Sequence, residues 1–292
     1  MSTTGLDRIE LTAALSDQWD ALAHLVGDLD ESRWRMPSPL PGWSIFDVLA
    51  HVVGTESMLL GEPLPAVDSD VRELAHVRND TGAMNEIWLE ALRPLTGAEL
   101  LRRFADVTDR RRTALAGLDD AAWQADIQSP IGVVPYGRFM RVRLFDCWMH
   151  QLDITDALGG GAAHAPRGGA AHALGGSPEQ DEGGRRAELA IDEIAPFLGR
   201  VVVKRGGAPD GSRIAIELTG PVTRELLIRV DGRAELVATL DRPADTVIRM
   251  TSSLFARLCG GRTGAGDHPG GIEIDGDHEL GSRVAANLAF TI

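Results

Sequence analysis

The residues with the clearest chemical potential lie in the segment F-D-C-W-M-H-Q-L-D, residues 145–153. Asp146 precedes His150 by four positions, and Asp153 follows three positions later. On a helix, residues four apart lie on the same face, so the carboxylate of Asp146 and the imidazole of His150 can hold one metal ion from adjacent turns. A hydrogen-bonded pair of buried side chains has the same spacing. This segment alone leaves both interpretations open.

The helix that carries the segment is predicted from about Arg138 to Leu158. Successive residues advance by about 100°, which gathers apolar and ionisable side chains on one side of the helix: Phe139, Val142, Asp146, His150, Asp153 and Ala157. The apolar members predict that this side faces the interior, where each ionisable group needs a partner or a cation. Arg143 lies near the same side, and Asp153 can either orient the ring of His150 or pair with Arg143.

A third ligand is available in W-S-I-F-D-V-L-A-H, residues 43–51. His51 lies on the flank of the apolar stripe of a predicted helix that begins at Ser44. With Asp146 and His150 it completes two imidazoles and one carboxylate, a set that leaves a coordination position open, as in catalytic metal sites. We expect Zn²⁺ at this site, although Fe²⁺, Ni²⁺ and Mn²⁺ also suit these ligands. The alternative for His51 is a partly buried core histidine.

Neighbouring residues have simpler interpretations. Asp47 is expected to cap the helix that begins at Ser44, and orientation of the His51 ring is its alternative role. Cys147 is interpreted as a small buried hydrophobe rather than a nucleophile. Trp43 is expected to pack where the loop meets the helix.

The elements that position these residues are mainly helical in the first half of the chain. Apolar residues recur at spacings of three and four in stretches before the long helix, near 11–26, 45–59, 84–91 and 100–115. Ser44 with Asp47, and Thr96 with Glu99, have the spacing of capping boxes. The segment P-I-G-V-V-P-Y-G, residues 130–137, is expected to be a loop. These helices predict a four-helix bundle with extra turns.

The composition changes after residue 158. Residues 159–184 are rich in Gly and Ala and are interpreted as a linker or a long surface loop. One helix is then predicted at 187–198, before alternating runs that are expected to form antiparallel strands at 200–204, 213–218, 225–230 and 234–240. A strand at 246–251, a helix capped by Ser252 and a terminal helix follow. The sequence therefore predicts three parts: a helical bundle over 1–158, the linker 159–184, and an α+β domain over 185–292.

Composition excludes several classes of function. The formal net charge is -14, with 43 acidic against 29 basic residues, which disfavours binding to a nucleic-acid backbone. Two cysteines are too few for a disulfide framework in a chain of 292 residues. The N-terminus lacks the pattern of a signal peptide, and no apolar window of about 18 residues predicts a membrane span. A reducing cytoplasm is the expected compartment.

Two segments carry a family resemblance. L-P-G-W-S-I-F-D-V-L-A-H-V-V-G-T-E and R-V-R-L-F-D-C-W-M-H-Q-L-D-I-T-D-A-L-G resemble the mycothiol-dependent maleylpyruvate isomerase family of actinobacteria. The resemblance covers the first 158 residues and implies a DinB-like metal-binding bundle. The tail G-D-H-E-L-G-S-R-V-A-A-N-L-A-F-T-I is similar to the family's C-terminal domain, which is related to sterol-carrier-like folds. The family's ligands, one His and an acid-x-x-x-His pair, fall on His51, Asp146 and His150. The isomerase has Glu where this chain has Asp146.

The resemblance also implies an activity. The metal would activate the thiol of mycothiol for addition to an electrophilic small molecule. In the isomerase, addition to a cis double bond permits rotation and elimination returns the trans isomer, whereas in transferase relatives the sulfur stays on the product. The family uses a C-terminal arginine for the substrate's carboxylates, and Arg262 is our candidate. The alternatives are a non-catalytic protein that binds a metal and an apolar ligand, and a structural bundle without metal.

Overall fold

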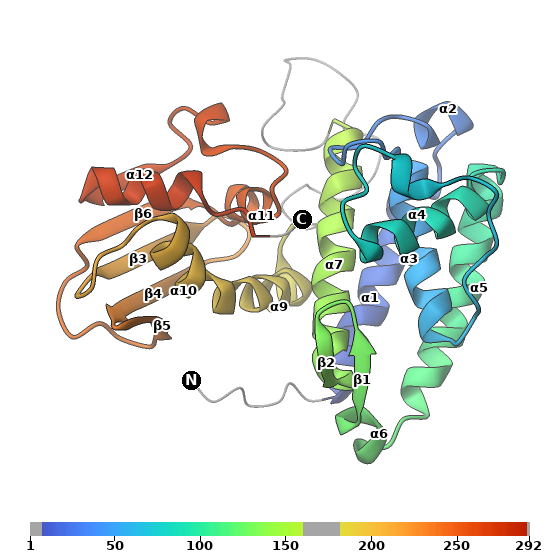
Figure 1. The fold of residues 1–292 in the computed structure, drawn as a ribbon, viewed down its shortest axis with the longest axis horizontal. Coiled ribbons are helices and arrows are strands. Elements are labelled where there is room, and N and C mark those ends of the chain that lie inside the picture. Colours follow the sequence, from blue (N-terminus) through green and yellow to red (C-terminus); the bar gives the residue numbers. More distant parts are fainter. Residues whose placement is uncertain (1–7, 160–181, 291–292) are drawn as a thin grey trace. The chain divides into compact units, whose positions relative to one another are not determined.

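The computed structural model describes residues 8–159 and 182–290, which form two compact units. The first unit is almost entirely helical, and the second combines helices with a five-stranded sheet (Figure 1). This confirms the predicted fold class, a helical bundle followed by an α+β domain. Most of the predicted linker 159–184 lies outside the described residues, so the exact domain boundaries stay a prediction. Among the described residues, no helix is long and apolar enough to span a membrane.

The first unit is built around a bundle of four helices, each of which contacts two of the others. They are α1 (Arg8–Val26), α3 (Ile45–Leu59), α5 (Gly97–Ala116) and α7 (Tyr136–Ala157). A further helix, α4 (Asp80–Leu92), packs against α3. Two short helices, α2 (Glu31–Trp34) and α6 (Asp120–Gln124), lie in the connections. The periodic apolar stretches predicted these helices because one face of each is buried in the bundle.

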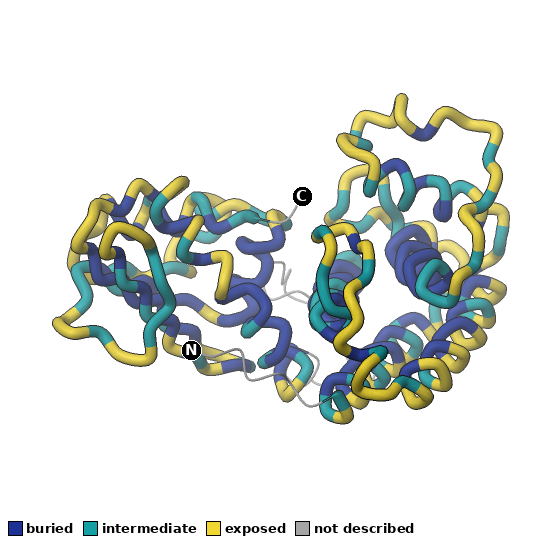
Figure 2. The backbone as a smooth tube through the Cα atoms, turned by 60° about the horizontal axis from the view of Figure 1, so that its bottom comes forward, coloured by how far each residue is buried: buried dark blue, intermediate teal, exposed yellow. Residues whose placement is uncertain are grey.

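Helix α3 lies in the interior of this unit. It is packed by α4, α5 and α7, and every residue from Ile45 to Ser57 is buried. Figure 2 shows the buried backbone gathered inside the unit and the exposed segments around it. An ionisable side chain on α3 is therefore removed from water on whichever face it lies, and it needs a partner there.

Both predicted capping boxes are present. The Ser44 hydroxyl accepts from the Asp47 amide, while the Asp47 carboxylate accepts from the Ser44 amide at 2.9 Å. Thr96 and Glu99 form the same reciprocal pair at the start of α5. The second oxygen of Asp47 accepts from Arg93 Nε at 2.9 Å. Asp47 therefore caps α3, as expected.

One prediction for the first unit was wrong. Residues 130–137, expected to be a loop, contribute to a small hairpin of β1 (Asp126–Ser129) and β2 (Gly132–Pro135), and α7 begins at Tyr136 rather than near Arg138. Gly132 turns the chain at a φ of 101°, a conformation that glycine adopts without strain. The strand sequences D-I-Q-S and G-V-V-P do not alternate polar with apolar residues, so the pattern that predicts a strand is absent from them.

The second unit contains a sheet with the strand order β5-β4-β3-β6-β7. Its strands are β3 (Arg213–Thr219), β4 (Arg224–Asp231), β5 (Arg233–Val237), β6 (Thr246–Thr251) and β7 (Glu273–Gly276). Neighbours pair antiparallel except β3 and β6, which are parallel. The main helices of the unit are α9 (Gly184–Ile194), α11 (Ser252–Cys259) and α12 (His278–Ala286), and both α11 and α12 contact β6.

Two local predictions for this unit were wrong. Residues 200–204, expected to be a strand, are helical: α10 (Leu198–Arg200) runs directly into a π-helical turn, Val201–Arg205. The valines favour a strand, but Val201 and Val202 are buried on the end of a helical segment, and tertiary burial overrides the local preference. The cap of α11 is Thr251, whose hydroxyl accepts from the Leu254 amide, rather than Ser252.

Candidate metal centre

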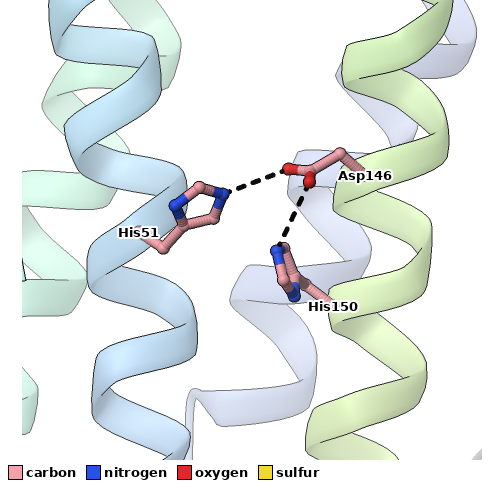
Figure 3. Close-up of side chains that lie close together, drawn as sticks. All are labelled: His51, Asp146 and His150. Carbon is pink, nitrogen blue, oxygen red and sulfur yellow. Dashed lines mark hydrogen bonds and ion pairs between the residues drawn. The ribbon is translucent and has the colours of Figure 1, made fainter. Parts of the chain in front are cut away.

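The three predicted ligands converge in the first unit. His51 lies on α3, while Asp146 and His150 lie one turn apart on α7 (Figure 3). His51 Nε2 is 3.3 Å from Asp146 Oδ2, and His150 Nε2 is 3.5 Å from Asp146 Oδ1. One ligand atom from each residue lies within 4.8 Å of the other two. The residues that sequence analysis brought together from two distant segments are therefore neighbours in space.

The donor set and its spacing suit a divalent cation. In a tetrahedral site with bonds of about 2.1 Å, ligand atoms lie about 3.4 Å apart. The two separations above are close to that value, although each is measured to a different oxygen of the Asp146 carboxylate. Two imidazole nitrogens and one carboxylate oxygen leave room for an additional ligand. Both histidines are buried, but the Asp146 side chain is 32% exposed, so the site is accessible from solvent on its side.

Asp153 determines the orientation of the His150 ring. His150 Nδ1 lies 2.9 Å from Asp153 Oδ2, and Asp153 is fully buried. A carboxylate at Nδ1 keeps the proton on that nitrogen and leaves the lone pair of Nε2 directed at the site. Of the two roles considered for Asp153, orientation of His150 is the one that the structure supports.

The His51 ring is held by aromatic contacts. Its centroid lies 5.4 Å from that of Trp43 and 4.9 Å from that of His150, the latter in an edge-to-face arrangement. His51 Nδ1 is buried and has no hydrogen-bond partner among the described residues. Trp43 therefore packs at the start of α3 as expected, and it also contacts the site, with its ring 6.3 Å from that of His150.

A buried carboxylate holds Trp43 in place. The indole Nε1 donates to Glu86 Oε1 at 2.6 Å, and the same oxygen lies 2.7 Å from His76 Nε2. Arg93 Nη2 approaches the other oxygen of Glu86 at 3.1 Å. The roles of Glu86 and His76 could not be predicted from the sequence, because their partners come from segments that are not adjacent in the chain.

Charges around the site set the protonation of its ligands. Burial would raise the pKa of Asp146, but the neighbouring His150, Arg143 and His51 hold that pKa well below its usual range. Burial lowers the pKa of His51. Burial also acts to lower the pKa of His150, but Asp146 and Asp153 outweigh it and raise that pKa to about 9. Without a metal the site thus contains an ionised carboxylate, a His51 ring that favours the neutral form, and a His150 ring that is protonated near neutral pH. A metal ion would have to displace the Nε2 proton of His150 before that nitrogen could bind it.

The buried partner of Arg143 was not predicted from the sequence. Its guanidinium donates to Asp146 Oδ2 at 2.5 Å and to Glu56 Oε1, and Glu56 is fully buried on α3. Glu56 belongs to the segment that carried the family resemblance, but no role was assigned to it. The signal was a glutamate in a helix whose other residues are mainly apolar, a placement that requires a buried cation nearby.

Cys147 is the small buried residue that was expected. It is fully buried as a free thiol, and burial raises its pKa well above the usual range. A neutral thiol in this position is a poor nucleophile.

Arg262 lies in the second unit, three residues after α11, and is half-buried. Its Nη1 donates to the carbonyl of Gly260 at 2.5 Å. The substrate-binding role suggested for Arg262 stays a prediction.

Comparison with known proteins identifies the family of this chain. Residues 15–155 match the mycothiol maleylpyruvate isomerase N-terminal domain, and residues 188–283 match the C-terminal domain of the same family. The helical unit followed by the α+β unit thus has the domain composition of that family. The chain belongs to the mycothiol-dependent maleylpyruvate isomerase family, which confirms the resemblance seen in the sequence.

Individual relatives are more distant. An uncharacterized protein found in two strains of Mycobacterium tuberculosis is 31% identical over 147 residues, which is 50% of this chain and 54% of that protein. The match therefore spans about half the length of these curated relatives. A crystal structure of the mycothiol-dependent maleylpyruvate isomerase superposes with a TM-score of 0.55 at 17% identity, covering 92% of this chain and 93% of the other. A crystal structure of a histidine-to-alanine mutant of that isomerase superposes with a TM-score of 0.53 at 16% identity. These likenesses show a shared fold.

Proposed function

We propose that this chain is a divalent-metal-dependent, mycothiol-dependent enzyme that activates the thiol for addition to an electrophilic small molecule. The observation that carries the proposal is that one possible ligand atom from each of His51, Asp146 and His150, on two helices, lies within 4.8 Å of the other two. Membership of the maleylpyruvate isomerase family supports the choice of thiol and of substrate class. Zn²⁺ is the cation we expect, and Fe²⁺, Ni²⁺ and Mn²⁺ are alternatives for the same ligands.

A divalent cation held by these residues supplies Lewis acidity, which lowers the pKa of a thiol at its open position so that the thiolate dominates near neutral pH. The chain's own residues prepare the site for that role. Asp153 directs the Nε2 lone pair of His150, and Trp43 covers the two imidazole rings on one side. The partly exposed Asp146 marks the side from which a small molecule can approach.

Two reactions follow from the same thiolate. Addition to an activated cis double bond forms a C–S bond and leaves a single bond that can rotate, and elimination then releases the trans isomer and the thiol. In a transfer reaction the C–S bond is kept and the thiol is consumed. We propose that Arg262 binds the carboxylates of the substrate in either case, because its planar fork matches a carboxylate.

Metal content is the first test. We expect protein purified without added metal to contain about one divalent ion per chain by elemental analysis, and His51→Ala to reduce this close to zero because two ligands remain. His24→Ala, an exposed histidine on α1, is the matched control and should keep the metal. Metal-free wild-type protein that cannot be loaded with any divalent cation would contradict the site.

The fate of the thiol is the second test. Metal-loaded protein is mixed with mycothiol and maleylpyruvate, and free thiol and product isomers are followed together. Thiol that is recycled while the trans isomer accumulates indicates an isomerase, and thiol that is consumed with an electrophile indicates a transferase. Metal binding without turnover of either would favour the non-catalytic protein that binds a metal and an apolar ligand.

A further inference from the structure

Arg143 connects a candidate metal ligand to buried charges deeper in the bundle. It lies on α7, three residues before Asp146, and only 3% of its surface is exposed. Its Nη1 donates to Asp146 Oδ2 at 2.5 Å, the same oxygen that lies 3.3 Å from His51 Nε2. Arg143 and His51 therefore contact the same oxygen of the Asp146 carboxylate.

The opposite edge of the Arg143 guanidinium is held by Glu56 on α3. Nε and Nη2 both donate to Glu56 Oε1, at 3.0 and 2.9 Å. A planar guanidinium that is bound along one edge has little freedom to rotate, so the direction of its remaining nitrogen is set. Glu56 therefore aims Arg143 Nη1 at Asp146.

Glu56 is held in turn from a third helix. It is fully buried, and its second oxygen accepts from Arg111 Nε on α5 at 2.8 Å. Asp146, Arg143, Glu56 and Arg111 form a ladder of alternating charge across α7, α3 and α5, which is buried except at Asp146. Each inner charge has an oppositely charged partner on both sides, as buried charges require.

We propose that Arg143 is a positioning residue for the candidate metal site, holding the Asp146 carboxylate in the orientation that meets His51 and His150. A carboxylate that is about one-third exposed would otherwise rotate about its terminal bond. This inference rests on the proposed metal site.

A purely structural role for the ladder makes a different prediction. If it only stabilises the bundle, weakening any of its links should lower the unfolding temperature and leave the metal affinity of the folded protein unchanged. If Arg143 positions Asp146, metal affinity should fall most in the variant that alters the contact with Asp146. Metal affinity and metal-free stability therefore separate the two roles.

The experiment compares Arg143→Lys with Arg111→Lys in the full chain. Both variants replace a buried arginine that contacts Glu56, but only Arg143 touches Asp146. Unfolding temperatures are measured without metal, Zn²⁺ affinity by competition with a chelator, and site geometry from the absorption spectrum of Co²⁺-loaded protein. We expect Arg143→Lys to lose about 10- to 100-fold in Zn²⁺ affinity and to alter the Co²⁺ spectrum, and Arg111→Lys to lose far less.

Glu56→Gln keeps the proposal testable if Arg143→Lys does not fold. It weakens the hold on Arg143 without touching Asp146, and it should also reduce Zn²⁺ affinity. Where all variants fold, the effects of Glu56→Gln and Arg143→Lys should not add in the double variant, because both act through one hydrogen bond. The inference would be overturned if Arg143→Lys bound Zn²⁺ as tightly as the wild type. It would also be overturned if Arg111→Lys lost as much Zn²⁺ affinity as Arg143→Lys. Wild-type protein that binds no metal would instead refute the proposed function.

Discussion

At the scale of single residues, the candidate site depends on polar groups that are placed by other polar groups. His150 is oriented by Asp153, Asp146 is contacted by Arg143, and Trp43 is held by Glu86. Without these contacts the donor atoms of the three ligands would not stay directed at one position, which a metal site requires.

The contact between Asp153 and His150 leads to a specific prediction. Asp153→Asn keeps the shape of the side chain but removes the negative charge that holds the proton on His150 Nδ1. We expect the affinity for Zn²⁺ to fall by about 10- to 100-fold, measured by chelator competition. Asp109→Asn is the control, because Asp109 is exposed on α5 and pairs with Arg112. Unchanged affinity in Asp153→Asn would mean that this hydrogen bond does not tune the ligand.

At the scale of elements, the position of α3 matters most, since it contributes His51 and Glu56 and is packed by α4, α5 and α7. Close approach of α4 depends on Gly54. A Cβ added at this glycine would come within 2.7 Å of the Trp88 side chain. The absence of a side chain at Gly54 therefore sets the distance between α3 and α4.

We expect Gly54→Ala to destabilise the protein. Overpacking against Trp88 costs about 1–3 kcal/mol, which exceeds the gain of about 0.5–1 kcal/mol from replacing a helical glycine by alanine. Gly82→Ala in the first turn of α4 is the matched control, since its Cβ would meet only ordinary contacts from 3.5 Å outward. Urea unfolding should show a lower free energy of unfolding for Gly54→Ala and an equal or higher one for Gly82→Ala. A higher free energy of unfolding for Gly54→Ala than for Gly82→Ala would show that α4 can shift away from α3 without an energetic penalty.

At the scale of the whole molecule, the candidate metal ligands and the candidate carboxylate-binding arginine belong to different units. His51, Asp146 and His150 lie in the helical unit, and Arg262 lies in the α+β unit. Metal binding and substrate binding should therefore respond separately to mutation.

Arg262→Lys tests this separation. Lysine keeps the charge but loses the planar fork, so we expect KM for a carboxylate substrate to rise about tenfold or more, with unchanged metal content. Arg242→Lys provides the control, since Arg242 is exposed in the same unit and pairs with Asp245. Kinetics of Arg262→Lys that match the wild type would exclude this arginine and direct the search to other arginines of the unit.

The sequence by itself was sufficient for the features that depend on local spacing. The helices of the bundle, both capping boxes and the pair Asp146 and His150 follow from residues three or four positions apart, because a helix brings those positions together wherever it lies. The fold class and the family resemblance came from the same regular segments. His51 was predicted as the third ligand because its helix belongs to the same predicted bundle.

Only the tertiary structure decided the contacts that join distant segments. The ladder through Arg143 and Glu56, the hold of Glu86 on Trp43, and the parallel pairing of β3 with β6 each join segments far apart in the chain. The helical state of residues 200–204 was decided in the same way, against the preference of its valines. Local preference differs by only about 1 kcal/mol between residue types, whereas burial and charge pairing in the folded chain involve larger energies and determine the final arrangement.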